Sequence, residues 1–476
     1  MARNAVPFDF DLALDDAIEP GPARVSAALV GAIAAGRLRD GDLVPSTRTI
    51  ARALALPRSM LVAAYEELVA AGFLDSRMGA GTTVAHGAEL AAQAGAFASS
   101  SHRKPDQALA SNVAPAPAVI AFDLRPGYPD ATLLDLPAIH RAFRAAVDGS
   151  PHGDHRDFVL LRAALVTYLR RSRGVVCEPG DIFIFPSVPM ALRAIAPALL
   201  TQDRPVAFED PGYVAGRQAL TGAGVDVRPV SVDHDGIRVD LLREDDGGVY
   251  VTPAHQYPLG ARMPVGRRAD LLAWAGNHGG LVLEDDYDGE FRYDVAPMPA
   301  VRAMRDAEDR VIYLGNASKM LTRDLRIAWA VVPTRFRQNM TRQIQRQGAI
   351  TSPVDARALA TLLNQGTLQR HVITARRTYA ARRARFTAAC QAVIPHIGIE
   401  GVTAGLHVVL LLPADVDDVA IVARLATQGV ACAPLSAYAL DPHGPRGLIC
   451  GYARLPESRA LQVARLIHDV LAAPPS

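Results

Sequence analysis

Several features are scarce in this chain of 476 residues, and each scarcity excludes a class of protein. The four cysteines are far apart in apolar surroundings, so neither a disulfide framework nor a CxxC metal site is expected. The formal net charge is only +1, so any contact with DNA must come from a local cluster of cations. No apolar run approaches the roughly 20 residues of a membrane span, and the acidic N-terminus lacks a signal-type apolar core. We therefore expect a cytoplasmic protein without a membrane segment.

Length and composition favour several domains. Half of the residues are apolar, which is ample for two or three separate cores. From about residue 86 to residue 117 the sequence becomes rich in Ala, Ser and Gly and loses its hydrophobic periodicity, which predicts a flexible linker. We therefore predict an N-terminal domain over residues 10–85 and a C-terminal domain over residues 118–476.

The N-terminal domain has the pattern of three helices followed by a β-hairpin. Val25, Leu29 and Ile33 form one apolar helical stripe. Ser46 is a candidate N-cap for a second helix, and Pro57 precedes a third. A Gly-rich turn then joins two short strands. This order predicts a winged helix-turn-helix.

The stretch "GRLRDGDLVPSTRTIARALALPRSMLVAAYEELVAAGFLDSRMGAGTTV" makes that prediction specific. Over nearly its whole length it resembles the DNA-binding domain of GntR-type bacterial regulators. The resemblance assigns the DNA contacts to Arg48, Arg58, Ser59 and, in the wing, Arg77 and Gly79. The start of the third helix suits this role, because side chains there reach base edges while backbone amides face phosphate. A double-stranded DNA operator is the expected partner.

The C-terminal domain alternates apolar, strand-like runs with helical segments. This alternation predicts an α/β fold with a mainly parallel central sheet, in which ligands gather where the strands end. Four polar clusters follow such strands: "EDPGY", "TPAHQYPLG", "LEDDYDGEFRYD" and "ASK". We therefore expect one ligand site, built from these clusters.

The same motifs, in this order, resemble the type I aminotransferase fold of aspartate aminotransferase. That resemblance implies a small C-terminal α+β subdomain and pyridoxal 5'-phosphate as cofactor. With the winged helix upstream, nearly the whole chain resembles the MocR type of GntR regulators. A homodimer is expected, since this fold builds its sites at a two-fold interface and paired DNA half-sites need two winged helices. The predicted linker is long enough for a domain-swapped dimer.

The resemblance assigns the cofactor to these residues: Lys319, Asp285, Tyr287, Tyr213, Arg326, Ser318, Asn316 and Ser187. Lys319 is expected to bind it covalently, Asp285 to keep its pyridine nitrogen protonated, and Arg326 to hold its phosphate. Tyr287 is expected to hydrogen-bond the phenolic oxygen of the ring, and Tyr213 to stack on the ring. The other three residues are further donors for the phosphate.

Two positions depart from the family pattern. The turn expected to receive the phosphate has Pro189, which lacks a backbone N–H, so cofactor affinity is expected to be weaker than usual. Ile449 occupies the place expected for the arginine that grips a substrate carboxylate. The sequence therefore favours a regulator over an enzyme.

Three functions remain open at this point. The favoured one is a DNA-binding regulator that senses an amine, an amino-acid-like compound or pyridoxal phosphate itself. The others are an active aminotransferase with a DNA-binding appendage, and a regulator that has lost the cofactor.

Overall fold

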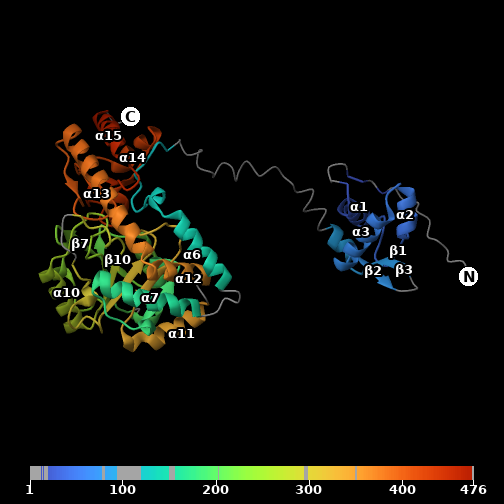
Figure 1. The fold of residues 1–476 in the computed structure, drawn as a ribbon, viewed down its shortest axis with the longest axis horizontal. Coiled ribbons are helices and arrows are strands. Elements are labelled where there is room, and N and C mark those ends of the chain that lie inside the picture. The colour runs from blue at the N-terminus through green and yellow to red at the C-terminus, as the bar shows by residue number, and fades with distance from the viewer. Residues whose placement is uncertain are drawn as a thin grey trace, which may run out of the picture. The chain divides into compact units, whose positions relative to one another are not determined.

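The computed structural model describes residues 12, 14–15, 20–77, 81–93, 120–149, 156–201, 203–293, 298–348 and 351–473. The chain divides into two compact units, Met1–Ala116 and Pro117–Ser476 (Figure 1). None of the helices in the described ranges is long and apolar enough to cross a membrane.

The small unit is a winged helix-turn-helix, as predicted. Its helices are α1 (Pro22–Ala34), α2 (Thr47–Ala53) and α3 (Arg58–Ala70). Its three-stranded sheet has the order β1-β3-β2, with β1 at Leu43–Val44, β2 at Leu74–Arg77 and β3 at Gly81–Val84. The predicted stripe of Val25, Leu29 and Ile33 is fully buried in the core of this unit.

Local sequence signals determine where the helices of this unit begin. The Ser46 hydroxyl accepts a hydrogen bond from the Thr49 backbone N–H at 3.2 Å, which satisfies one free donor at the start of α2. Pro57 precedes α3 and offers no side-chain cap. The first backbone amides of α3 therefore have no capping side chain of their own.

The folded part of this unit extends beyond the boundary predicted at residue 85. Residues 88–93 are helical, and Ala88 and Ala92 are buried in the same core as α1. The start of the predicted linker is thus a short helix that packs on the small unit. Alanine buries little apolar area, so a helix that packs through alanines produces a weak hydrophobic pattern in the sequence. The rest of the predicted linker, residues 94–117, lies outside the described residues.

The large unit is built on a mixed eight-stranded sheet with the order β5-β12-β11-β10-β9-β6-β7-β8. The strands are β5 (Ile182–Phe185), β6 (Val206–Asp210), β7 (Val227–Asp233), β8 (Gly236–Ile237), β9 (Gly248–Val251), β10 (Leu281–Asp286), β11 (Val311–Asn316) and β12 (Ala328–Val331). The neighbours from β11 to β7 are parallel, whereas β12 and β8 pair antiparallel with their neighbours. The ends of β6, β9, β10 and β11 therefore meet at one edge.

Helices cover this sheet (Figure 1). They are α6 (Leu136–Gly149), α7 (Arg156–Arg173), α8 (Val188–Leu199), α9 (Val214–Thr221), α10 (Val265–His278), α11 (Arg337–Gln347), α12 (Pro353–Asn364) and α13 (Thr367–Val393). Every residue of β5, β9, β10 and β12 is buried, which explains why these strands appear in the sequence as continuous apolar runs.

The predicted small subdomain is also present. Its four-stranded antiparallel sheet has the order β13-β14-β17-β16, with β13 at Ile399–Glu400, β14 at His407–Leu412, β16 at Ala433–Pro434 and β17 at Arg446–Gly451. Helices α14 (Asp418–Thr427) and α15 (Ala460–Ala472) belong to it. A two-stranded parallel sheet pairs β4 (Phe122–Asp123) with β15 (Val430–Ala431). Helix α13 links the subdomain to the rest of the unit, because Leu368 packs in one core and Phe386 in the other.

Candidate functional site

The converging strand ends of the large unit form a cavity of about 280 Å³. All the residues assigned to the cofactor from the sequence line it: Ser187, Tyr213, Asp285, Tyr287, Asn316, Ser318, Lys319 and Arg326. They come from four segments that are distant in the chain, so the fold brings together what the sequence keeps apart.

Lys319 lies just beyond the end of β11 and is half-buried. Its Nζ donates a hydrogen bond to the Gly127 carbonyl oxygen at 2.7 Å. Gly127 has a φ of +77°, a conformation that favours glycine, and a Cβ at this position would force Nζ to move. Burial, helped by the positive charge of Arg323, lowers the pKa of Lys319 to about 8. A substantial share of this amine is therefore neutral and nucleophilic near neutral pH.

Asp285, at the end of β10, is the buried acid of the cavity. Its Oδ2 accepts a hydrogen bond from the Tyr250 hydroxyl, whereas its buried Oδ1 has no partner in the described structure. Burial raises the pKa of Asp285 to about 7. Since buried polar atoms are nearly always satisfied, the free Oδ1 fits a cationic N–H donor supplied by a ligand.

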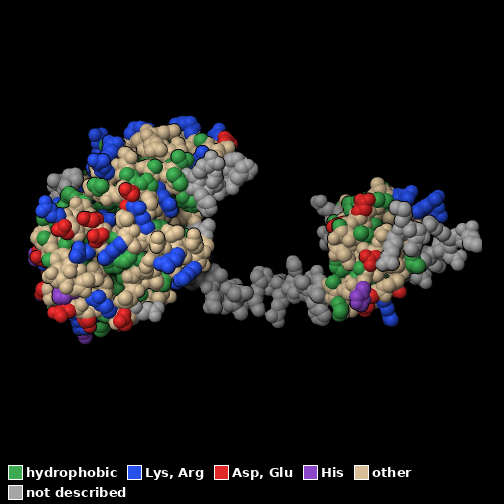
Figure 2. Space-filling view, turned by 90° about the horizontal axis from the view of Figure 1, so that it is seen from below, with side chains coloured by type: hydrophobic (Ala, Val, Ile, Leu, Met, Phe, Trp, Pro, Cys, Tyr) green, Lys and Arg blue, Asp and Glu red, His purple; other side chains and the backbone are tan. Residues whose placement is uncertain are grey.

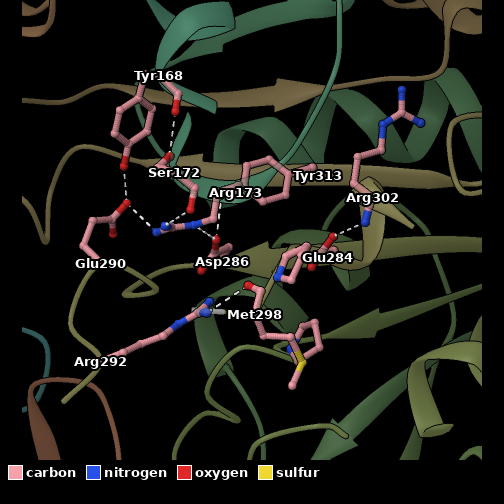
Figure 3. Close-up of polar contacts among 12 residues, drawn as sticks. Tyr168, Ser172, Arg173, Glu284, Asp286, Glu290, Arg292, Met298, Arg302 and Tyr313 are labelled. Atoms are coloured by element: carbon pink, nitrogen blue, oxygen red, sulfur yellow. Dashed lines mark hydrogen bonds and ion pairs between the residues drawn. The ribbon is translucent and has the colours of Figure 1, made fainter. Parts of the chain in front are cut away.

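The next residue of β10, Asp286, has the opposite surroundings, because successive side chains of a strand point to opposite faces. It binds the Arg173 guanidinium and accepts a hydrogen bond from the Tyr313 hydroxyl at 2.8 Å (Figure 3). Burial alone would raise the pKa of Asp286, but the charge of Arg173 holds it below its ordinary value. Asp286 is thus a paired structural acid, while Asp285 remains available to a ligand.

The start of α8 forms the part of the cavity where the phosphate was expected. The Ser187 hydroxyl caps this helix by accepting a hydrogen bond from the Met190 N–H at 3.4 Å. Pro189 supplies no N–H. This helix start therefore offers fewer free amides than a turn without proline, and the Ser187 O–H is its remaining side-chain donor.

The other predicted phosphate ligands keep free donors. Arg326 is exposed, and its Nε donates to the Pro186 carbonyl oxygen at 3.4 Å, which leaves its terminal nitrogens available. The Ser318 backbone N–H donates to Asn316 Oδ1 at 3.1 Å, so the amide N–H₂ of Asn316 and the hydroxyl of Ser318 remain available.

The aromatic residues of the cavity are held by a polar network. The Tyr287 hydroxyl lies 2.8 Å from His255 Nδ1, and the same nitrogen lies 2.9 Å from Asp288 Oδ2. Burial raises the pKa of Tyr287 well above its ordinary range, so its hydroxyl keeps its proton. Tyr213 packs edge-on against Tyr257, with ring centroids 6.0 Å apart.

The structure adds residues that the sequence reasoning did not assign. Thr252, Tyr257 and Arg323 also line the cavity. The first two belong to "TPAHQYPLG", so the motif was noticed but these residues received no role. Arg323 lies over the Tyr128 ring at 4.1 Å, and nothing in its local sequence indicates this contact. Ile449 is fully buried in an apolar cluster, so β17 offers no cation at that position.

The predicted DNA contacts lie on the small unit. Arg48, Arg58 and Ser59 are exposed, and Arg58 is the first residue of α3. Arg77 ends β2, and Gly79 lies outside the described residues. In the view of Figure 2 this unit carries a few arginine side chains, and its described part contains no lysine. Among the described residues, no group of His, Cys, Asp and Glu could hold a metal ion.

Comparison with known proteins gives the family. The profile of the gntR family of bacterial regulatory proteins matches residues 23–84, and that of aminotransferase class I and II matches residues 135–466. Over 457 residues the chain is 32% identical to the rhizopine catabolism regulatory protein MocR of Rhizobium meliloti, covering 93% of this chain and 92% of that protein. The chain belongs to the MocR-type regulators of the GntR family.

Other relatives agree with this assignment. The MocR-type chain is 30% identical to the pyridoxine biosynthesis transcriptional regulator PdxR of Corynebacterium glutamicum, over 95% of this chain and 96% of that protein. The large unit shares its fold with kynurenine aminotransferase of Pyrococcus horikoshii, with a TM-score of 0.67 and 24% identity, over 77% of this chain and 93% of that one. This MocR-type protein is therefore a transcription regulator whose large domain has the fold of pyridoxal-phosphate enzymes.

Proposed function

We propose that this regulator binds pyridoxal 5'-phosphate covalently through Lys319 and uses it to sense a small amine or amino-acid-like effector. The observation that carries the proposal is the pairing, in one cavity, of a lysine with a lowered pKa and a buried aspartate whose Oδ1 lacks a partner. A cofactor with an aldehyde and a protonated ring nitrogen satisfies both groups at once.

The other residues of the cavity have supporting roles in this proposal. When bound, the cofactor supplies an electrophilic carbon that captures amines. Arg326, Asn316 and Ser318 hold its phosphate through their free donors. The Tyr287 hydroxyl donates a hydrogen bond to the oxygen of the ring, and Tyr213 packs against the ring.

We favour sensing over turnover because of Ile449. An aminotransferase must hold its substrate carboxylate in one orientation to move a proton at the α-carbon, and an arginine fork suits that task. The buried Ile449 supplies no such fork. An effector amine can be captured by the cofactor that Lys319 holds, without that alignment of its carboxylate.

The proposed output is a change in DNA binding. In this proposal Arg58 reads a base from the start of α3, while Arg48, Ser59 and the wing around Arg77 and Gly79 contact the DNA backbone or minor groove. We further propose a homodimer, since two winged helices match the paired half-sites of an operator.

The chain offers a direct test of covalent binding, because its sequence contains only two lysines, Lys104 and Lys319. The protein is incubated with pyridoxal phosphate, reduced with borohydride and digested, and the modified peptide is identified by mass. We expect the label on Lys319, and the same label in a Lys104→Arg variant. A label confined to Lys104, or no label with excess cofactor, would contradict the proposal.

Residual transaminase activity is the second candidate, since every residue assigned to the cofactor is present in the cavity. It is measured as release of a keto acid from an amino-acid donor by the cofactor-loaded protein. We expect a spectral change on adding amines without sustained release. Release over many turnovers would make the protein an enzyme with a DNA-binding domain.

A further inference from the structure

The large unit contains a second cavity, of about 630 Å³, more than twice the volume of the cofactor cavity. It lies between the C-terminal half of α7, the end of α12, the first turns of α13 and the segment 289–293. One part of the lining is apolar and is formed by residues of α12 and α13: Leu363, Leu368, Val372 and Ile373.

The rest of the lining is rich in arginine. It contains Arg171, Arg173, Arg292 and Arg376, whereas Glu290 is the one carboxylate among the described residues of the lining. Cavities lined by one sign of charge concentrate ligands of the opposite sign. The question is therefore which of these arginines already have partners.

Arg173 is neutralised within the protein. Its guanidinium binds both Asp286 and Glu290, and the Tyr168 hydroxyl donates to the same Glu290 oxygen (Figure 3). One guanidinium with two carboxylates leaves one negative charge in excess, and the charge of Asp286 also acts on Arg292. The network therefore offsets only part of the positive charge of the lining.

None of the remaining arginines forms a salt bridge with a carboxylate in the part of the chain that the structure describes, although the charge of Asp286 acts on Arg292. Arg292 is 9% exposed; its Nη1 donates to the Met298 carbonyl oxygen at 2.9 Å, and its buried Nε has no partner. Arg376 donates from Nε and Nη2 to the Glu290 carbonyl oxygen at 2.9 and 2.6 Å. Arg171 is exposed on the same side. Of the three, only Arg292 is buried, since Arg171 and Arg376 are exposed. Burying a guanidinium whose one direct hydrogen bond is to a neutral carbonyl group is costly, and a bound anion would lower that cost.

We propose that this cavity binds a small organic anion. A carboxylate or phosphate group would be held by Arg171, Arg292 and Arg376, while an apolar body would pack against α12 and α13. The volume lies within the roughly 300–1,000 Å³ usual for ligand pockets. A cationic ligand would be repelled by the arginines, and a neutral one would leave their charges uncompensated. The site is separate from the cofactor cavity, since no described residue lines both.

The test is a calorimetric titration of the full chain with phenyl phosphate, after the cofactor cavity has been saturated with pyridoxal phosphate. We expect one site per chain. Arg376→Ala and Arg171→Ala should each weaken binding about ten- to a hundredfold, since hydrogen bonds to charged groups contribute about 1.5–3 kcal/mol. Arg377→Ala and Arg170→Ala are matched controls, because these exposed neighbours on α13 and α7 do not line the cavity, and they should bind normally.

Further arms separate this site from the alternatives. Inorganic phosphate should bind at least about tenfold more weakly than phenyl phosphate, because it cannot use the apolar wall. Equal affinity for the two would overturn the apolar part of the proposal. No binding of phenyl phosphate would overturn the whole, as would binding that Arg326→Ala abolishes and Arg376→Ala leaves intact, since that places the anion in the cofactor cavity.

Discussion

The two folded units place their functional side chains in opposite environments. In the large unit, Lys319 and Asp285 lie in a cavity where burial changes the pKa of both groups. In the small unit, Arg48 and Arg58 are exposed and keep the full reach of their side chains. Burial makes a few groups reactive by shifting their pKa values, whereas exposed arginines act by extending their side chains to a binding partner. Substitutions in the cavity should therefore abolish cofactor binding, whereas substitutions on the small unit should weaken DNA binding by degrees.

The largest expected effect is that of Lys319→Ala. Because no other residue of the cavity carries an amine that can bond to the cofactor, the visible absorption band of the loaded protein should disappear completely. Affinity for operator DNA without effector should be unchanged, since the small unit folds around its own core. Absorbance and a DNA titration on the same preparation measure both. A surviving band would show that Lys319 is not the attachment point.

On the small unit, Arg58→Ala should weaken specific DNA binding about ten- to a hundredfold, as expected for one bidentate contact with a base of roughly 1–3 kcal/mol. It should also relax preference at one base pair in each half-site. Arg48→Ala should instead weaken binding to all DNA sequences alike. It should also reduce the slope of log affinity against log salt concentration by about one. Titrations against specific and scrambled duplexes at several salt concentrations separate the two. Equal losses on both duplexes for Arg58→Ala would remove its role as a base reader.

The pH dependence of stability tests the environment of Asp285. Its pKa is about 7 in the folded, cofactor-free protein and near 3.8 in an unfolded chain. Between these values only the folded state holds the proton, so this group lowers the free energy of unfolding as pH rises, by about 1.4 kcal/mol per pH unit. The loss is complete above pH 7, where both states are ionised.

Asp285→Asn removes this titration and keeps an acceptor for Tyr250. The stability of the variant relative to wild type should therefore rise between pH 5 and pH 7, measured as the melting temperature of the large unit. Burial also raises the pKa of Glu284 to about 7, but this group titrates in both proteins and cancels in the difference. The pKa of Glu209, also about 7, is raised mainly by burial and in small part by the charge of Asp285, so the substitution should lower it slightly. If the melting temperatures of the variant and the wild type change in parallel with pH, Asp285 is solvated.

The smallest expected effect is that of Ser46→Ala. The loss of this helix cap should lower the stability of the small unit by about 1 kcal/mol. The melting of the large unit should not change. Calorimetry that resolves the two transitions measures this, with Ser46→Asp as a control that retains a capping oxygen. A shift in both transitions would show that the units unfold together.

Several features could be read from short stretches of the sequence because their causes are local. The Ser46 cap and the apolar stripes follow from spacing along the chain, and the winged-helix order follows from them. Four polar clusters follow strand-like runs, and parallel strand ends share one edge of a sheet, which predicts one ligand site. The choice of Lys319, Asp285 and their neighbours within these clusters came from the resemblance to aminotransferases, and the structure places them in one cavity.

Other features depend on contacts between distant residues, which no local pattern encodes. Tyr250 is 35 residues from its partner Asp285, and Arg173 is 113 residues from Asp286. Before folding, Asp285 and Asp286 are two adjacent acids with the same ordinary pKa. Only the tertiary structure turns one toward an arginine and places the other in a cavity without a cationic partner, because burial and the position of neighbouring charges decide the pKa of each. The sequence by itself thus determined the winged helix, the α/β fold and their order in the chain, and packing decided which groups are buried and paired.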